Sequence, residues 1–214
     1  MIKSPPPTIV IGRLPIYLRE LVRLSKEKAG STTSSQELAL RLGISSAQIR
    51  KDLSHFGEFG KQGTGYNIDN LIAQLQKILH LTEKWNVIVV GAGYLGHALA
   101  HYGGFQRRGF CITHVFDNDP EKIGQAMADI VVEDLTDLER IIQENEIEMA
   151  ILAVPTTVAQ STVNRLIKAG IKAILTYTPI HLKVPDHIHI SYSDPVVQLQ
   201  QMAYYLPDQK KKKV

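Results

Sequence analysis

The sequence predicts an α/β protein in two parts, a small helical domain followed by a larger parallel-sheet domain, with one further helix at the C-terminus. Two capping boxes and apolar residues at helical spacing occupy the first part. A buried type of β run at 87–90 then meets a glycine-rich turn, after which strand and helix patterns alternate. We therefore expect domains at 1–81 and 82–193 and a separate C-terminal segment at 194–214.

The composition allows each domain a hydrophobic core and differs in charge between them. The 214 residues are 44% hydrophobic, which suffices for two modest domains. Residues 1–85 carry twelve Lys and Arg against seven Asp and Glu, whereas residues 86–214 carry twelve against fourteen. A basic first domain on an acidic second one fits a nucleic-acid contact confined to the first. Ordinary variation in surface charge is the alternative.

Cysteine usage and hydropathy bear on the compartment. The lone Cys111 excludes an intramolecular disulfide and suits a reducing cytosol. The sequence has no apolar run of about 18 residues and no N-terminal secretion signal. We therefore expect a soluble, cytoplasmic protein with no membrane partner.

Three helices are expected at the start of the first domain. Apolar residues at helical spacing predict the first over 14–28. Ser34 and Glu37 form a capping box that opens a second helix over 35–42. A further capping box, Ser45 to Gln48, opens the third helix.

The third helix has two chemically different sides. Ile49, Leu53 and Phe56 fall on one side and are expected to pack inward. Small, polar and basic side chains gather on the other side: Ala47, Gln48, Arg50, Lys51, Ser54 and His55. Gln and Arg hydrogen-bond base edges, Ala contacts a thymine methyl group, and Lys and Ser hold phosphates. We therefore predict a helix-turn-helix that places this helix in a major groove.

A glycine-rich segment, 57–66, follows the third helix and is interpreted as a hairpin wing. Its four glycines let backbone approach a duplex closely, and Lys61, Gly63 and Tyr66 are the expected DNA contacts. A helix over 67–81 closes the domain. The alternative is a small helical bundle whose flexible loop binds protein rather than DNA.

The second domain opens on a dinucleotide-type fingerprint. Gly91, Gly93 and Gly96 follow the strand at 87–90 and precede a helix at 97–102, which is the context that a Rossmann-type fold requires. Gly91 permits the tight turn, Gly93 lets backbone approach a pyrophosphate, and Gly96 lets helix pack on strand. The phosphates would lie at the helix N-terminus.

The residues at strand ends suggest which nucleotide is bound. Asp117 follows the strand at 112–116, 21 residues after Gly96, where a carboxylate accepts hydrogen bonds from ribose hydroxyls and repels a 2′-phosphate. We therefore predict NAD(H) over NADP(H), with a coenzyme A site as the main rival. Val154-Pro155 and Thr178-Pro179 are further candidate contacts at strand ends. The remaining strands are expected at 129–132, 149–154, 173–177 and 189–192, and the remaining helices at 135–144 and 158–169.

The sequence offers little for catalysis. Only 124 residues run from Gly91 to the C-terminus, about enough for one nucleotide-binding sheet. His97 and His101 have the i, i+4 spacing of metal ligands without an evident third ligand, and His187 and His189 alternate on a predicted strand. We predict no catalytic and no metal residues, with a minimal reductase as the alternative.

The chain resembles the Rex family of bacterial redox-sensing transcriptional repressors over nearly its whole length. The segments that carry the resemblance are Ile49 to Gly57 (IRKDLSHFG), Gly65-Tyr66, Gly91 to Gly96 (GAGYLG), Phe116 to Pro120 (FDNDP) with Lys122, and Ser193-Asp194. Their combination is far more specific than the helix or the glycine turn alone.

The resemblance implies a homodimer with a winged-helix head, a Rossmann-type body and a domain-swapped C-terminal helix. It implies a repressor that binds double-stranded, inverted-repeat operator DNA when NADH is low and releases it when NADH binds, and so senses the NADH/NAD+ ratio. Tyr102 matches a position near the nicotinamide. Arg19, Tyr102 and Asp194 match positions that couple the cofactor to the angle between head and body. The complete set of expected cofactor contacts is Gly91, Ala92, Gly93, Tyr94, Leu95, Gly96, Tyr102, Asp117, Lys122, Val154 and Pro155.

The C-terminal segment is expected to be helical. Asp194 and Pro195 make a good N-cap and first helical residue, and apolar residues then recur at helical spacing. This apolar face needs a partner, either a second subunit or its own. Lys210 to Lys213 either contact DNA phosphates or form a solvated tail.

Overall fold

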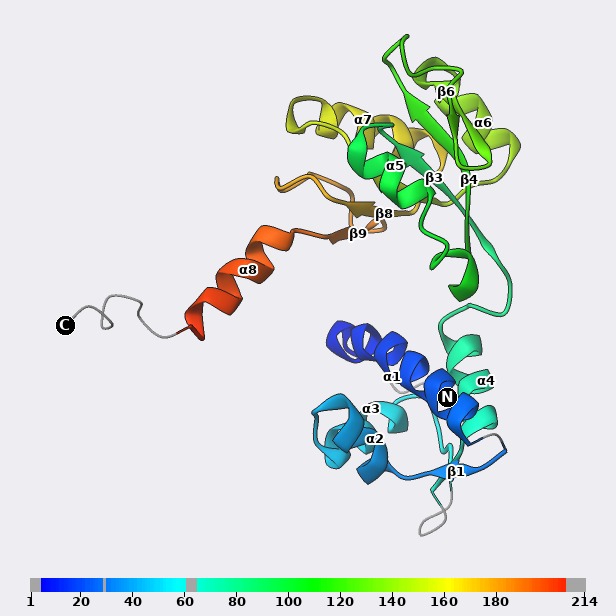
Figure 1. Ribbon diagram of the computed structural model, residues 1–214, viewed down its shortest axis with the longest axis vertical. Helices are drawn as coiled ribbons and strands as arrows, with labels where there is room; N and C mark the ends of the chain where they lie inside the picture. The colour runs from blue at the N-terminus through cyan, green and yellow to red at the C-terminus, as the bar shows by residue number, and fades with distance from the viewer. Residues whose placement is uncertain (1–4, 29, 61–64, 207–214) are drawn as a thin grey trace, which may run out of the picture. The chain divides into compact units, whose positions relative to one another are not determined.

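The computed structural model of the chain describes residues 5–28, 30–60 and 65–206. It divides into two compact units, one up to Glu83 and one from Lys84 onward (Figure 1). The first unit is helical with one small sheet, and the second contains a seven-stranded sheet. The predicted fold class, helix-turn-helix followed by a parallel-sheet domain, is therefore confirmed.

Four helices make up the first unit: α1 (Thr8–Glu27), α2 (Ser35–Leu42), α3 (Ser46–Ser54) and α4 (Ile68–Ile78). Both predicted caps form, because the Ser34 hydroxyl accepts from the Glu37 N–H and the Ser45 hydroxyl accepts from the Gln48 N–H. Gly43, at φ +67°, ends α2 in the left-handed conformation. The inward stripes of all four helices meet in one core that includes Leu14, Leu21, Leu38, Ile49 and Leu75.

Helix α1 begins six residues before the predicted start at Leu14. Pro15 lies inside it, which argues against a helix from sequence alone. Val10 and Leu14 are buried on the same stripe as Tyr17 and Leu21, however. The burial of that stripe outweighs the local cost of the proline.

The small sheet of the first unit lies beside the predicted wing. Strand β2 (Tyr66–Asn67) pairs antiparallel with β1 (Thr32–Thr33), which precedes α2, and a Cβ at Gly60 would lie 2.5 Å from the Gly65 carbonyl oxygen, so the two described ends of the glycine-rich segment are close together. Gly65, at φ +77°, stands where a Cβ would lie 2.4 Å from the Thr33 carbonyl oxygen. This close approach requires glycine. Residues 61–64 lie outside the described residues, and with them the predicted contacts Lys61 and Gly63.

The sheet of the second unit has the order β5-β6-β4-β3-β7-β8-β9. All its pairs are parallel except β5 with β6. The chain passes from β3 to β4 on one side and reaches β7 on the other, so the strand order reverses beside β3. The strands are β3 (Trp85–Val90), β4 (Phe110–Asp117), β5 (Ala126–Met127), β6 (Ile130–Asp134), β7 (Met149–Leu152), β8 (Ala173–Thr176) and β9 (His189–Tyr192).

The two faces of this sheet are covered unequally. Alternate residues such as Ile88, Val90 and Leu152 pack against α6 (Leu138–Glu144) and α7 (Thr156–Ala169). The intervening residues, including Val87, Val89 and Ile151, form a smaller core with α5 (Tyr94–Ala100). Figure 1 shows α5 on one side of the sheet and α6 and α7 on the other. The face that carries α5 therefore has less helical cover.

Three further elements complete the second unit. Short 3-10 helices lie at Gln106–Arg108 and Leu135–Asp137. Helix α8 (Pro195–Tyr204) begins where the sequence predicts, and the Asp194 carboxylate accepts from the Val196 N–H at 2.9 Å. None of the residues of α8 is buried, although several are apolar: Leu199 and Met202 are each 62% exposed.

Candidate functional site

The outer side of α3 is the candidate nucleic-acid interface. Ala47, Arg50, Lys51, Ser54 and His55 are all exposed there, as the sequence predicts. The Ser54 hydroxyl donates to the Lys51 carbonyl oxygen, and one guanidinium nitrogen of Arg50 donates to the Ser35 hydroxyl at 2.9 Å. Helix α3 thus presents a basic, polar side, and a major groove is wide enough to admit an α-helix.

Gln48 is only half-buried, in contrast to its exposed neighbours, and binds within the protein. Its side-chain nitrogen donates to Asp52 Oδ1 at 2.6 Å. Asp52 is completely buried. The Arg13 guanidinium donates to both of its oxygens, at 2.5 and 2.8 Å, and the Tyr17 hydroxyl donates to Asp52 Oδ2 at 2.6 Å. Burial raises the pKa of Asp52, but the hydrogen bonds from Arg13, Tyr17 and Gln48 outweigh it and hold that pKa below its usual range.

The Asp52 contacts fix α3 on α1. Arg13 and Tyr17 both lie on α1, whereas Asp52 and Gln48 lie one turn apart on α3. A buried, fully hydrogen-bonded carboxylate between two helices sets their register. The predicted wing contact Tyr66 is half-buried at β2, and burial raises the pKa of its hydroxyl group.

The glycine turn between β3 and α5 has the geometry that the fingerprint predicts. Gly91 has φ +107°, and a Cβ there would lie 2.3 Å from the Ala153 carbonyl oxygen. A Cβ at Gly96 would lie 1.9 Å from the Gly91 carbonyl oxygen, so no side chain fits. A Cβ at Gly93 would meet no protein atom within 4 Å. The chain is closely packed around two glycines and leaves open space at the third, where a pyrophosphate is expected.

Asp117 lies beside this turn at the end of β4. Its Oδ2 accepts from the Ala92 N–H at 2.7 Å, and its Oδ1 accepts from the Asp119 N–H at 2.9 Å. The Lys122 ammonium group lies 3.3 Å from Asp117 and 3.2 Å from Asp119. Burial raises the pKa of Asp117, but these hydrogen bonds and Lys122 bring it below its usual range. Asp117 is thus an anion that stabilises the glycine turn, at the strand end where the sequence predicts a contact to ribose.

The loops after β3 and β7 meet at the point where the strand order reverses. Strand β7 ends at Leu152, two residues before the predicted end, so Val154 and Pro155 lie in the loop that precedes α7. The Thr178 hydroxyl donates to the Val154 carbonyl oxygen at 3.2 Å. At the start of α5, Tyr94 is fully exposed and Leu95 is 39% exposed. The predicted contacts from Gly91 to Gly96 therefore gather with Asp117 and Val154 at the carboxyl ends of the strands.

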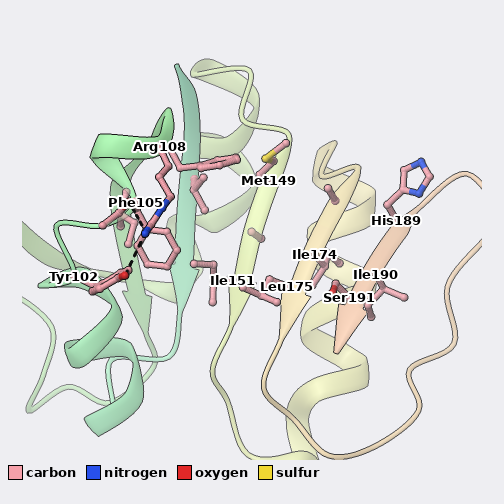
Figure 2. Close-up of a pocket in the computed structure, with 16 residues that line it drawn as sticks. Tyr102, Phe105, Arg108, Met149, Ile151, Ile174, Leu175, His189, Ile190 and Ser191 are labelled. Atoms are coloured by element: carbon pink, nitrogen blue, oxygen red, sulfur yellow. Dashed lines mark hydrogen bonds between the residues drawn. The ribbon is translucent and has the colours of Figure 1, made fainter. Parts of the chain in front are cut away.

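An apolar cavity of about 450 Å³ lies elsewhere, on the thinly covered face of the sheet. Met149, Ile151, Leu175 and Ile190 from β7, β8 and β9 line it, and Figure 2 shows Tyr102, Phe105 and Arg108 on the other side. Arg108 donates to the Tyr102 hydroxyl at 3.2 Å and thereby lowers the pKa of that hydroxyl. Tyr102, which the family resemblance places near the nicotinamide, thus lines this cavity and lies outside the glycine turn.

The other two residues expected to couple cofactor and DNA lie in different units. Arg19 is exposed on α1 in the first unit, and Asp194 caps α8 in the second. Asp194 is half-buried and uses one carboxylate oxygen for its cap.

Comparison with known proteins identifies the family. The family described as "Putative DNA-binding protein N-terminus" matches residues 7–54, and the family described as "CoA binding domain" matches residues 82–180. The curated "Redox-sensing transcriptional repressor Rex" of Chloroflexus aggregans (strain MD-66 / DSM 9485) is 48% identical over 94% of each chain. The protein of the same name from Roseiflexus sp. (strain RS-1) is 50% identical over 94% of this chain and 91% of its own.

The chain belongs to the Rex family.

Solved Rex structures share the complete architecture of this Rex protein. The "Crystal structure of RSP in complex with beta-NAD+ and operator DNA" matches it with a TM-score of 0.91 at 40% identity, covering 99% of this chain and 97% of RSP. The structure of RSP with beta-NADH matches with a TM-score of 0.87 at 38% identity, covering 99% of each chain. The predicted resemblance is thus confirmed as family membership.

His97 of α5 and His101, which caps the end of that helix, contact each other and the neighbouring backbone. The rings of His97 and His101 stack with centroids 4.2 Å apart, and His101 Nε2 accepts from the Ala128 N–H. Across the described ranges, no three metal-ligating side chains lie close enough together to hold an ion. Among the described helices, none combines the length and the apolar character needed to cross a membrane.

Sequence reasoning missed two features of this Rex protein. It treated Asp52 as part of a motif and assigned it no contact, although a carboxylate flanked by inward-facing residues on α3 indicates a buried partner. It also missed the cavity on the sheet and Arg108 beside Tyr102. No local signal indicates the cavity, because it depends on which strands lack a helix above them.

Proposed function

We propose that this protein is a homodimeric repressor that binds an inverted-repeat operator when NADH is scarce and releases it when NADH binds. One observation carries the proposal: a single chain combines a basic, exposed α3 with a glycine turn that is open only at Gly93. The complexes of RSP with operator DNA and with either form of the dinucleotide support it. Lys51, Arg50 and their neighbours on α3 bind DNA, and Lys61 and Gly63 of the wing assist.

The dinucleotide is held at the carboxyl ends of β3, β4 and β7. The backbone from Gly91 to Gly96 accommodates the pyrophosphate, since Gly93 leaves room for it. Asp117 binds the adenosine ribose and excludes a 2′-phosphate, and Lys122 holds Asp117 in its charged form. Oxidised nicotinamide carries a positive charge that the reduced ring lacks, so apolar surroundings favour NADH over NAD+.

The dimer forms by exchange of α8. This helix has an apolar side with no buried residue, and the cavity on the sheet has mostly apolar walls. Each copy therefore supplies what the other lacks, which produces a two-fold symmetric pair. Such a pair presents two α3 helices, as an inverted-repeat operator requires.

Coupling between cofactor and DNA runs through Tyr102, Arg19 and Asp194. Tyr102 lies on the wall of the cavity that receives α8, so Asp194 at the start of a partner's α8 comes close to it. A change in this contact alters the angle between the units and the spacing of the two α3 helices. Since NADH and DNA then favour different arrangements, DNA weakens NADH binding by the same factor as NADH weakens DNA binding.

We further propose that the protein is not an enzyme and that it acts in the cytoplasm. Its family relatives carry the name of repressors, and the described part of the second unit is built on one seven-stranded sheet. A coenzyme A ligand is the rival, suggested by the name of the family that matches residues 82–180. Asp117 at the ribose position and the two dinucleotide complexes of RSP favour NAD(H) instead.

A fluorescence-anisotropy titration of a labelled inverted-repeat duplex at fixed salt tests the proposal. We expect tight DNA binding that NADH abolishes and NAD+ barely changes. Tight binding that responds to coenzyme A alone would overturn the choice of cofactor. Absence of DNA binding would favour the reductase.

Two sets of variants then test the division of roles. Arg19→Ala or Asp194→Ala should leave DNA binding measurable but uncouple it from NADH. Lys51→Ala should weaken DNA binding and leave the affinity for NADH unchanged. Intact coupling in both of the first variants would contradict the proposed coupling contact.

A further inference from the structure

The side-chain amide of Gln48 is held in one orientation by a carboxylate that cannot donate. Gln48 Nε2 donates to Asp52 Oδ1 at 2.6 Å, and both oxygens of Asp52 are also bound by Arg13. An ionised carboxylate only accepts hydrogen bonds, so the NH₂ group of Gln48 must be on the side of Asp52. The Gln48 carbonyl oxygen, Oε1, must therefore be on the other side of the amide.

Gln48 Oε1 is an acceptor without a donor. Within the described part of the chain, no N–H or O–H group donates to it, whereas every polar atom of Asp52 has a partner. Gln48 lies in the first turn of α3, between the exposed Ala47 and Arg50. In a helix-turn-helix, this part of the third helix comes closest to the base edges.

We infer that Gln48 is a specificity-determining residue that recognises, through Oε1, an amino group on a base edge in the major groove, and that Asp52 is its positioning residue. The adenine N6 and cytosine N4 amino groups are the donors on that edge, whereas guanine O6 and thymine O4 would face Oε1 with an acceptor. This inference rests on the proposed binding of operator DNA.

The Asp52 contacts explain why the preference would be sharp. A free glutamine turns its amide over and binds either a donor or an acceptor on a base. Here Arg13 and Tyr17 hold Asp52 from α1, and Asp52 in turn holds the amide, so turning it over would break the 2.6 Å hydrogen bond and bring two oxygens together. The fixed amide thus discriminates between bases before DNA is bound.

Selection from a library of inverted-repeat duplexes with randomised half-sites tests the inference. We expect the wild type to select adenine or cytosine at one position, repeated symmetrically in both half-sites. Gln48→Met keeps the length of the side chain and should select the same motif with that position degenerate, and its affinity should fall on the order of tenfold per half-site. Unchanged preference at every position in Gln48→Met would overturn the inference. Failure of the wild type to select any motif would instead overturn the proposed function.

A pair of variants separates positioning from mere stability. Asp52→Asn can turn an N–H toward Gln48, so we expect the preference for adenine or cytosine at that one position to fall at least tenfold. Tyr17→Phe removes a different hydrogen bond to Asp52 and should keep the preference within about twofold. An equal loss of preference at all positions in both variants would show a purely structural role for Asp52. If Asp52→Asn does not fold, the library selection with Gln48→Met decides alone.

Discussion

The two units of this protein differ in how many of their polar groups and apolar surfaces have partners within the same unit. In the first unit, four helices close one core, and the buried Asp52 uses both oxygens for protein contacts. In the second unit, the sheet carries an apolar cavity of about 450 Å³, and α8 exposes its apolar side chains. Space is also left at Gly93. Among the described residues, the buried groups that join α1 to α3 in the first unit all have partners, whereas the second unit leaves places for a ligand and for another copy.

This difference indicates where a switch can operate. A head whose third helix is fixed by Arg13, Tyr17 and Asp52 does not need to change its own fold to release DNA. A body with an open turn and an unpartnered helix changes when either place is filled. We therefore expect NADH to change how the proposed dimer presents its two heads and to leave the structure of each head unchanged.

The largest expected effect comes from blocking the exchange of α8. Leu199→Glu replaces an apolar side chain, which we expect to enter a partner's cavity, with a charged one. Burying an unpaired charge there would be costly. The variant should be monomeric in sedimentation velocity, and its affinity for the operator should fall by about 10⁴-fold because one half-site contact replaces two. Gln200→Glu adds the same charge to a polar position and should remain dimeric. A dimeric Leu199→Glu would contradict the exchange.

The next effect concerns the completeness of the head. Asp52→Ala leaves the half-buried Arg13 guanidinium and the buried Tyr17 hydroxyl without their partner, which should cost about 3–5 kcal/mol of unfolding free energy. Glu27→Ala, which removes an exposed partner of Arg41, should cost far less, because water screens an exposed ion pair. Urea unfolding followed by far-ultraviolet circular dichroism measures both. Equal losses would show that Asp52 is no more important than a surface ion pair.

The same carboxylate makes the head sensitive to acid. The pKa of Asp52 is lowered in the folded protein relative to the unfolded chain. Its contribution to stability is therefore fully present above the unfolded-state pKa of about 3.9 and is lost as the pH falls toward the folded-state pKa. Stability between pH 6 and pH 3 should fall more steeply in the wild type than in Asp52→Asn. Parallel curves would mean that other carboxylates govern acid unfolding.

The openness of the body is tested at its glycines. Gly93→Ala meets no atom within 4 Å, so stability should change by less than about 0.5 kcal/mol while the affinity for NADH falls about 100-fold as the Cβ occupies the pyrophosphate position. Gly103→Ala, also in open space, should change neither quantity. Gly96→Ala should instead destabilise the second unit, because its Cβ would overlap the Gly91 carbonyl group. Calorimetric titration with NADH and thermal unfolding distinguish these outcomes. If Gly93→Ala bound NADH as tightly as the wild type, the pyrophosphate would have to bind somewhere other than beside Gly93.

The sequence predicted those features whose signal is local. The N-caps at Ser34, Ser45 and Asp194 and the glycine turn all formed, because each depends on residues a few positions apart. The family resemblance added the cofactor and the DNA target.

Features that depend on distant residues could not be predicted in this way. Helix α1 extends through Pro15 because Val10 is buried, and β2 finds its partner in β1, more than thirty residues earlier. From the sequence, Gln48 is expected to be free to contact DNA. Its amide in fact binds Asp52, and no local pattern shows this because Asp52 is itself held by residues of α1. The cavity beside Tyr102 arises from the order of the strands, which no local pattern states.

The smallest expected effect concerns a single unsatisfied hydroxyl group in the interior of the second unit. Among the described residues, the hydroxyl of Thr113 on β4 is the one buried side-chain polar atom without a hydrogen-bond partner, and it lies in the second unit. Thr113→Val removes this unsatisfied group at nearly the same volume and should raise stability by about 1 kcal/mol, or the melting temperature by roughly 4 °C. Thr162→Val is the matched control, because the Thr162 hydroxyl is buried but donates to the Val158 carbonyl oxygen at 2.9 Å, so its loss should lower stability by a similar amount. Opposite signs for these two chemically identical substitutions would show that the second unit contains an unsatisfied buried atom as well as uncovered surfaces. Destabilisation by both would mean that the Thr113 hydroxyl has a partner, such as a bound water molecule.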